Sequence, residues 1–130
     1  MRRSGLLHPE LLALVARAGH TDIIVIADAG LPLPRGVPCI DLSVRAGLPS
    51  FLDVLEAITD ELVIEGATVA SEMRVRSSAL HTQLLERLPM TPAEVNHEAF
   101  KAMLPNALGI VRTGETTPYA NIALHCGVSF

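Results

Sequence analysis

Polar residues that could carry chemistry stand at both ends of a strongly apolar run. His20 lies shortly before residues 23–27, and Asp28 follows them directly. A buried carboxylate without a partner costs several kcal/mol, so Asp28 needs either a function or a hydrogen-bond partner. Histidine exchanges protons near neutral pH, and a nearby carboxylate can orient its ring. The pair therefore suits a site that moves a proton.

Further polar residues lie later in the chain. His97 and Lys101 are four residues apart, so on a helix they would share one face and could contact one ligand. Tyr119 and Asn121 belong to the loop of residues 112–121, which leaves a predicted strand. Ligands of open α/β sheets bind beside the carboxyl ends of the strands. A proton-moving histidine, a carboxylate and several hydroxyl-binding side chains together suit a polyol.

Structural interpretations of these residues stay open beside the chemical ones. Asp28 could cap the turn that follows it, and Lys101 could be a solvated helix charge. Zinc bound by His20, His97 and Asp28 is a further alternative, but no additional ligand stands at a suitable spacing. Arg112 and Glu115 are expected to pair and shape their turn. The remaining histidines are expected to be helix-end or surface residues: His8, His81 and His125.

Composition and missing motifs exclude several classes of function. The net charge is −4, with one Tyr and no Trp, so the chain offers neither a basic stripe nor a stacking platform for nucleic acid. Cys39 and Cys126 are too few for a cysteine-based zinc site, and no role is assigned to them. The sequence contains no P-loop, dinucleotide-binding or nucleophile-elbow motif. No familiar catalytic template therefore applies.

Apolar content is high for a short chain. Hydrophobic residues make up 49% of the sequence, and the mean hydropathy is +0.39. No apolar stretch reaches the roughly 18–20 residues of a membrane span, and charges at Glu10 and Arg17 make the leucine-rich start an amphipathic helix. We therefore expect a cytoplasmic protein without membrane contact. The excess apolar surface predicts association into a homo-oligomer.

Helices and strands are expected to alternate within one domain of residues 1–130. The alternation favours an α/β fold whose sheet is covered by helices on both faces. Ser50 and Asn96 are expected to cap two of the helices. Helices are expected over residues 8–20, 50–62, 77–88 and 96–104, and strands over residues 23–27, 39–44, 63–71, 108–114 and 122–128.

Four motifs in register resemble the D-ribose pyranase family, the sugar mutarotases found with bacterial ribose-uptake systems. They read GHTDIIVIADAGLPLP, IDLSVRAGLPSFLDVL, HEAFK and RTGETTPYANIALHCGV, and the resemblance runs from about Leu6 to the end of the chain. Related fucose mutarotases typically read SDAHFP where residues 27–32 are ADAGLP, and YGN where residues 119–121 are YAN. Both differences favour the ribose branch.

The resemblance implies a fold, a reaction and a set of site residues. The fold is a single-domain, three-layer α/β/α unit with a mainly parallel or mixed central sheet. The reaction interconverts the β-pyranose and β-furanose forms of D-ribose without cofactor or metal. The family assembles as decamers of two stacked pentameric rings, with sites between neighbouring subunits. His20 corresponds to the family's proton donor, and its sugar-binding positions correspond to Asp28, His97, Lys101, Tyr119, Ala120 and Asn121, with Ala120 contributing only its backbone.

A mechanism and its rivals follow from this interpretation. Ring opening needs a proton on the ring oxygen, and we expect His20 to supply it, with Asp28 close enough to stabilise the imidazolium. Whether Asp28 or another group accepts the anomeric proton stays open. One rival is a mutarotase for another sugar such as fucose, and a second is a non-catalytic sugar-binding accessory of ribose uptake. A metal-dependent aldose–ketose isomerase and a purely structural ring-former are the others.

Overall fold

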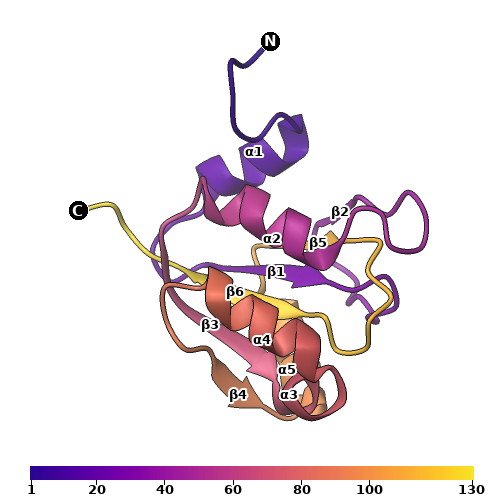
Figure 1. Cartoon of the computed structure of the whole chain (residues 1–130). Helices are drawn as coiled ribbons and strands as arrows, with labels where there is room; N and C mark the ends of the chain where they lie inside the picture. Colours follow the sequence, from indigo (N-terminus) through magenta and orange to yellow (C-terminus); the bar gives the residue numbers. More distant parts are fainter.

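Helices and strands alternate along the chain and build one six-stranded sheet with helices on both faces (Figure 1). The computed structural model describes all residues 1–130. The strands are β1 Ile23–Ala27, β2 Cys39–Asp41, β3 Ile64–Ala70, β4 Ala93–Val95, β5 Gly109–Arg112 and β6 Ile122–Cys126. The helices are α1 Pro9–Arg17, α2 Phe51–Thr59, α3 Ser71–Arg76, α4 Ser78–Arg87 and α5 His97–Met103, followed by the 3-10 turn η1 Leu104–Asn106.

The direction of the strands decides where loops meet. The strand order is β2-β5-β1-β6-β3-β4, and β6 is antiparallel to both of its neighbours, β1 and β3. All the other pairings are parallel. Five strands therefore end at one edge of the sheet, where β6 begins; we call it the carboxyl-terminal edge. The five strands begin, and β6 ends, at the opposite edge. The sheet is thus mixed, within the predicted α/β/α fold.

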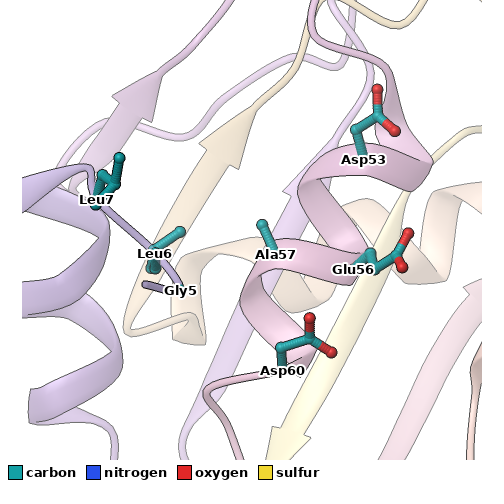
Figure 2. A pocket seen from close by; sticks show the side chains of 7 residues that line it. All are labelled: Gly5, Leu6, Leu7, Asp53, Glu56, Ala57 and Asp60. Carbon is teal, nitrogen blue, oxygen red and sulfur yellow. The ribbon is translucent and has the colours of Figure 1, made fainter. Parts of the chain in front are cut away.

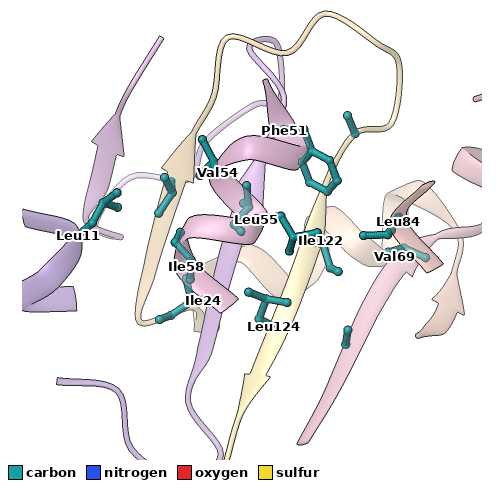
Figure 3. Packing of buried hydrophobic residues seen from close by; sticks show 14 of the residues in the cluster. Leu11, Ile24, Phe51, Val54, Leu55, Ile58, Val69, Leu84, Ile122 and Leu124 are labelled. Carbon is teal, nitrogen blue, oxygen red and sulfur yellow. The ribbon is translucent and has the colours of Figure 1, made fainter. Parts of the chain in front are cut away.

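Side chains of β1 alternate between two hydrophobic clusters. Ile24 and Ile26 belong to the larger cluster, which packs under α1, α2 and α4, and Figure 3 shows part of it around Phe51. Val25 and Ala27 face the smaller cluster under α5 and η1. All four side chains are fully buried. This explains why the strand reads as a continuous apolar run, as strands covered on both faces do.

Side chains cap the starts of three helices, and two of these caps, Ser50 and Asn96, were predicted. The Ser50 hydroxyl accepts a hydrogen bond from the Asp53 N–H (3.1 Å), and the Asn96 side chain accepts one from the Ala99 N–H (2.8 Å). The His8 ring accepts one from the Leu11 N–H (3.3 Å), so this histidine is a helix-end residue, as expected. Such caps are worth about 1 kcal/mol each.

Three short elements were not predicted. Helix α3, strand β4 and turn η1 are only three to six residues long, too short for a hydrophobic period to develop. Strand β4 is largely exposed, so its sequence lacks the apolar run that marks the central strands. No helix combines the length and apolar character that crossing a membrane requires.

Candidate functional site

The carboxyl-terminal edge gathers most of the predicted site residues. Asp28 follows the end of β1, and His97 opens α5 just beyond the end of β4. Tyr119 and Asn121 close the loop between β5 and β6, immediately before β6 begins. Because the sheet brings these strand ends to one edge, residues up to 93 positions apart in sequence come into contact.

Asp28 and Asn121 are joined by two hydrogen bonds. The Asp28 backbone N–H donates to Asn121 Oδ1 (2.8 Å), and Asn121 Nδ2 donates to Asp28 Oδ2 (3.0 Å). Asn121 is fully buried. The other carboxylate oxygen, Asp28 Oδ1, accepts a hydrogen bond from the Gly30 N–H (2.9 Å), so Asp28 also caps its turn. Both sequence interpretations of Asp28 are therefore compatible, and its carboxylate has a fixed orientation.

The loop before β6 turns sharply at Tyr119. This residue has a φ of 62°, in the left-handed region that non-glycine residues seldom adopt. The preceding carbonyl, of Pro118, accepts a hydrogen bond from the Ser77 hydroxyl (2.6 Å). Ala120 is fully buried. The Tyr119 ring meets the His97 ring edge to face, with centroids 5.1 Å apart and planes at 84°. Backbone strain of this kind gathers at ligand sites, which fits the predicted role of residues 119–121.

A carboxylate from α3 fixes the start of α5. The His97 backbone N–H donates to both carboxylate oxygens of Glu72 (2.9 and 3.1 Å). This hydrogen bond is the main cause that lowers the pKa of Glu72, and the Ser71 hydroxyl contributes. The side-chain atom His97 Nδ1 is buried and has no hydrogen-bond partner. Buried polar atoms are nearly always paired, so this atom is available to a water molecule or a ligand.

Lys101 extends the site along α5. Its Nζ pairs with Glu98 Oε1 at 2.8 Å, and the hydrogen bond from Lys101 lowers the pKa of Glu98. The lysine side chain is 31% exposed, whereas that of Glu98 is 83% exposed. Such an exposed ion pair is weak, so a ligand hydroxyl can replace the carboxylate as a partner of the ammonium group.

Two hollows of similar size lie at different places on the surface. One, of about 460 Å³, opens beside Asp28 and is lined by Gly30, Glu115 and residues 116–118. Its volume is in the range of small-molecule sites. The other, of about 450 Å³, lies between the segment before α1 and the acidic outer side of α2 (Figure 2). This second hollow contains none of the predicted site residues, and neither do three others on the surface. The hollow beside Asp28 is therefore the candidate site, although Asp28 is the one predicted site residue in its lining.

The expected pairing of Arg112 with Glu115 is wrong. Arg112 pairs instead with Asp41 on the neighbouring strand β2, at 3.0 Å. Glu115 accepts hydrogen bonds from the Phe51 N–H (3.0 Å) and the Thr117 hydroxyl (2.9 Å). Arg112 still belongs to β5 and lies opposite Asp41 in the sheet, whereas Glu115 lies in the following loop, beside the start of α2. Glu115 is thus structural, although for a reason other than the one predicted.

His20 lies at the opposite edge of the sheet, away from Asp28. The two residues flank the five-residue strand β1, whose ends are about 13 Å apart at about 3.3 Å per residue. Their expected contact within one chain is therefore wrong, and so is the zinc set of His20, His97 and Asp28. No group of three or more His, Cys, Asp or Glu side chains is arranged to hold a metal ion. The His20 ring contacts Glu65 instead, with Nε2 3.0 Å from Oε2.

Other charged and histidine side chains have local structural partners. His81 lies 3.8 Å from Glu94, and His125 Nε2 lies 3.0 Å from the Thr68 hydroxyl.

The sequence interpretation did not single out Glu65 or Glu72, which contact two of the predicted site residues. Only their positions could have marked them as candidates: Glu65 stands near the start of the predicted strand 63–71, and Glu72 follows its end.

Comparisons with known proteins agree over the full chain. Residues 1–129 match the model of the family described as RbsD / FucU transport protein family. A D-ribose pyranase of Cutibacterium acnes is 48% identical over 139 residues, covering 100% of both chains. Another, of Geobacillus kaustophilus, is 50% identical over 131 residues, covering 100% of this chain and 96% of its own.

Two solved structures resemble the fold closely. Bacillus subtilis RbsD complexed with D-ribose superposes with a TM-score of 0.96 at 40% identity, covering 100% of both chains. The fucose mutarotase in complex with L-fucose from Streptococcus pneumoniae reaches a TM-score of 0.76 at 26% identity, covering 95% of this chain and 94% of the other. The first likeness is the stronger on both measures.

Proposed function

The chain belongs to the RbsD / FucU transport protein family, and on this premise we propose that it is a D-ribose pyranase. It interconverts the β-pyranose and β-furanose forms of D-ribose. The observation that carries this proposal is full-length identity of 48–50% to proteins named D-ribose pyranase. The RbsD complexed with D-ribose adds support, since its fold superposes over the whole chain.

The reaction divides into protonation, rotation and closure. Opening the hemiacetal needs a proton delivered to the ring oxygen and another removed from the anomeric hydroxyl. The free aldehyde then rotates, and a different hydroxyl closes the ring. In our proposal His20 delivers the first proton, and a general acid of this kind is worth about 10²–10⁴ in rate. Free ribose already exchanges slowly in water, so a modest site suffices.

The carboxyl-terminal edge holds the sugar in this proposal. Asp28 is orientated by Asn121 and so presents fixed acceptors to sugar hydroxyls. His97 Nδ1 is a buried atom without a partner, and Lys101 is a donor beside it on the same helix. Tyr119 covers the His97 ring, and Ala120 contributes only its backbone. The arrangement requires no cofactor or metal, so a chelator should leave the rate unaltered.

The separation of His20 from Asp28 supports a site shared between copies of the chain. Within one chain β1 keeps the acid and the sugar-binding edge apart. A second copy can bring its own His20 to the carboxyl-terminal edge of the first. We propose that the chain forms a decamer of two stacked pentameric rings, in which every site combines residues of neighbouring subunits. We also propose that it works in the cytoplasm, a reducing compartment that suits two unpaired cysteines.

Exchange spectroscopy tests the activity directly. The anomeric proton signals of D-ribose are recorded by NMR with and without the protein, and pyranose–furanose exchange is expected to accelerate. L-Fucose serves as the comparison sugar, and faster exchange of fucose alone would identify a fucose mutarotase. Bound ribose with an unaltered exchange rate would mean a non-catalytic sugar-binding module. Formation of ribulose, abolished by a chelator, would mean a metal-dependent isomerase.

Mixing two inactive variants tests the shared site. His20→Ala and Asp28→Asn chains are produced separately and together, so that mixed oligomers form. If each site takes His20 from one copy and Asp28 from another, about a quarter of the sites regain both residues at random mixing. No recovery in mixed oligomers would contradict the shared site. Native mass spectrometry checks the assembly, for which we expect ten times the 13.9 kDa of one chain.

A further inference from the structure

We propose that Glu65 is a positioning residue that orients the His20 imidazole and thereby selects Nδ1 as the proton-donating atom. The inference rests on the proposed function, in which His20 is the acid. Glu65 Oε2 lies 3.0 Å from His20 Nε2, and this is the ring's hydrogen bond within the chain. A carboxylate at one ring nitrogen fixes the proton there and leaves the other nitrogen for chemistry.

The turn that carries His20 is held in a fixed shape. The Gly19 N–H donates to Asp22 Oδ2 (2.8 Å), and the Asp22 N–H donates to the Gly19 carbonyl (3.1 Å). Thr21 has a φ of 74°, which is a genuine outlier for a β-branched residue. Its N–H donates to the Cys126 carbonyl (3.0 Å) at the end of β6. The surrounding structure therefore maintains a strained turn next to the histidine, as it does at functional sites.

A bulge in β3 places the carboxylate. Ile64 pairs with Cys126 of β6 and Gly66 pairs with His125, so Glu65 is the extra residue without a partner on β6. Bulges of this kind re-aim a side chain and are common next to active sites. Two local departures from regular structure, at Thr21 and at Glu65, thus converge on one contact between side chains.

Other charged groups near the ring have different partners. The Asp22 carboxylate is used by the Gly19 N–H, and the His125 ring contacts the Thr68 hydroxyl. Glu65 is therefore the carboxylate that contacts the His20 ring. Within one chain the two side chains are 55% and 47% exposed, so they stand at a surface that a second copy can cover. Excluding water would strengthen the contact in the shared site.

The proton transfer balances with this assignment. Imidazolium donates the Nδ1 proton to the ring oxygen as the bond from that oxygen to the anomeric carbon breaks, and the anomeric hydroxyl gives its own proton to a base or to water as it becomes the aldehyde oxygen. The Nε2 proton stays on the hydrogen bond to Glu65, so the ring becomes the neutral Nε2–H form. On closure another hydroxyl attacks the aldehyde carbon and loses its proton to Nδ1, which restores the imidazolium, while the aldehyde oxygen takes a proton back and becomes the new anomeric hydroxyl. Glu65 itself neither gains nor loses a proton.

The test compares Glu65→Gln with Glu65→Asp and with Glu86→Gln. Glu86 is an exposed residue of α4, so its variant loses the same charge away from the site. In Glu65→Gln we expect the maximal rate of ribose exchange to fall about 10–100-fold, part of the 10²–10⁴ that the acid itself is worth, with little change in the ribose concentration at half-saturation. Glu65→Asp should recover part of the rate, and Glu86→Gln should match the unaltered protein.

Nitrogen-15 NMR of the histidine rings supplies a readout that structural damage alone would not move. Neutral His20 is expected to be the Nε2–H tautomer, and Glu65→Gln should shift it towards a mixture of tautomers. An unaltered tautomer and rate in Glu65→Gln would overturn the proposal, as would equal loss in Glu86→Gln. If the unaltered protein does not accelerate ribose exchange, the proposed function and this inference are both wrong. If the unaltered protein is active and the Glu65→Gln variant is unaffected, only this inference is wrong.

Discussion

The carboxyl-terminal edge and the opposite edge of the sheet carry different kinds of functional residue. At the first, Asn121 is fully buried and bonded twice to Asp28, and His97 Nδ1 is buried too. At the second, His20 and Glu65 are about half exposed and hydrogen-bonded only to each other. One edge is assembled within the chain before any ligand arrives. The other presents its reactive group outwards.

This difference separates binding from catalysis along one short strand. The residues proposed to hold the sugar need fixed geometry, which buried hydrogen bonds provide. The residue proposed to donate the proton must reach a sugar held by another copy, so it has to be exposed. Substitutions at the two edges should therefore differ: stability should suffer at the first, and the rate alone at the second.

The largest expected effect is on the rate in His20→Ala. Ring exchange of D-ribose should slow by about 10²–10⁴, because the general acid is lost. The free energy of unfolding should stay within about 0.5 kcal/mol, since within one chain the side chain is half exposed and contacts only Glu65. Exchange spectroscopy and urea unfolding measure the two quantities. If His20→Ala lost about 1–3 kcal/mol of stability, as expected for removing a buried hydrogen-bonding group, the two edges would not differ in the way proposed.

Asn121→Ala should show the converse pattern. The substitution removes both hydrogen bonds to Asp28 and empties a buried position, so unfolding should become easier by about 1–3 kcal/mol. Ribose should also bind more weakly, because Asp28 loses its orientation. Asn106→Ala, at an exposed residue of η1, is the matched control and should change little. Calorimetric titration with ribose measures binding, and urea unfolding measures stability. If Asn121→Ala were as stable as the unaltered protein and bound ribose normally, the proposed role of Asn121 would be contradicted.

Glu72→Gln should weaken the start of α5 in a pH-dependent way. Hydrogen bonding from His97 lowers the pKa of Glu72 below its ordinary 4.5, so its carboxylate stabilises the fold above that pH. The contribution is lost as the pH falls through the lowered value. The unaltered protein should therefore be the more stable at pH 7, with the difference shrinking as the pH falls below 4.5. Urea unfolding at several pH values checks this, and a constant difference would contradict it.

The smallest expected effect concerns the rate at which a thiol reagent labels Cys126. Burial, with the charges of Asp22 and Glu65, raises the pKa of its thiol to about 11, so little thiolate exists at neutral pH. In a Cys39→Ser background a thiol reagent should modify Cys126 slowly until the protein unfolds. Cys39, exposed on β2, should react faster in the reciprocal variant. Fast labelling of folded Cys126 would mean that the opposite edge opens readily.

Local signals predicted much of the fold. The continuous apolar run at β1 and the caps at Ser50 and Asn96 were correct because each depends on a few neighbouring residues. The short elements α3 and β4 depend on tertiary packing instead. Strand β4 exists because its backbone pairs with β3, and nothing in its own three residues requires that.

The site was predicted as a set of residues but not as an arrangement. Asp28 and Asn121 were both singled out, and they do meet. The expected contact of His20 with Asp28 failed because proximity in sequence was taken for proximity in space, although an extended strand separates its ends. The partner of Arg112 was missed for a related reason, since Asp41 lies on a neighbouring strand 71 residues away.

The outermost strands bear on how such an apolar chain stays in solution. Strands β2 and β4 are three residues each, preceded by Pro38 and Pro92, and both carry a charged residue. Long, flat, uncharged outer strands invite other chains to extend the sheet without limit, which is how aggregates and amyloid fibrils grow. These outer strands offer too few backbone groups for that. A chain proposed to associate with its own copies is thus protected from one form of open-ended association, the unlimited extension of its sheet.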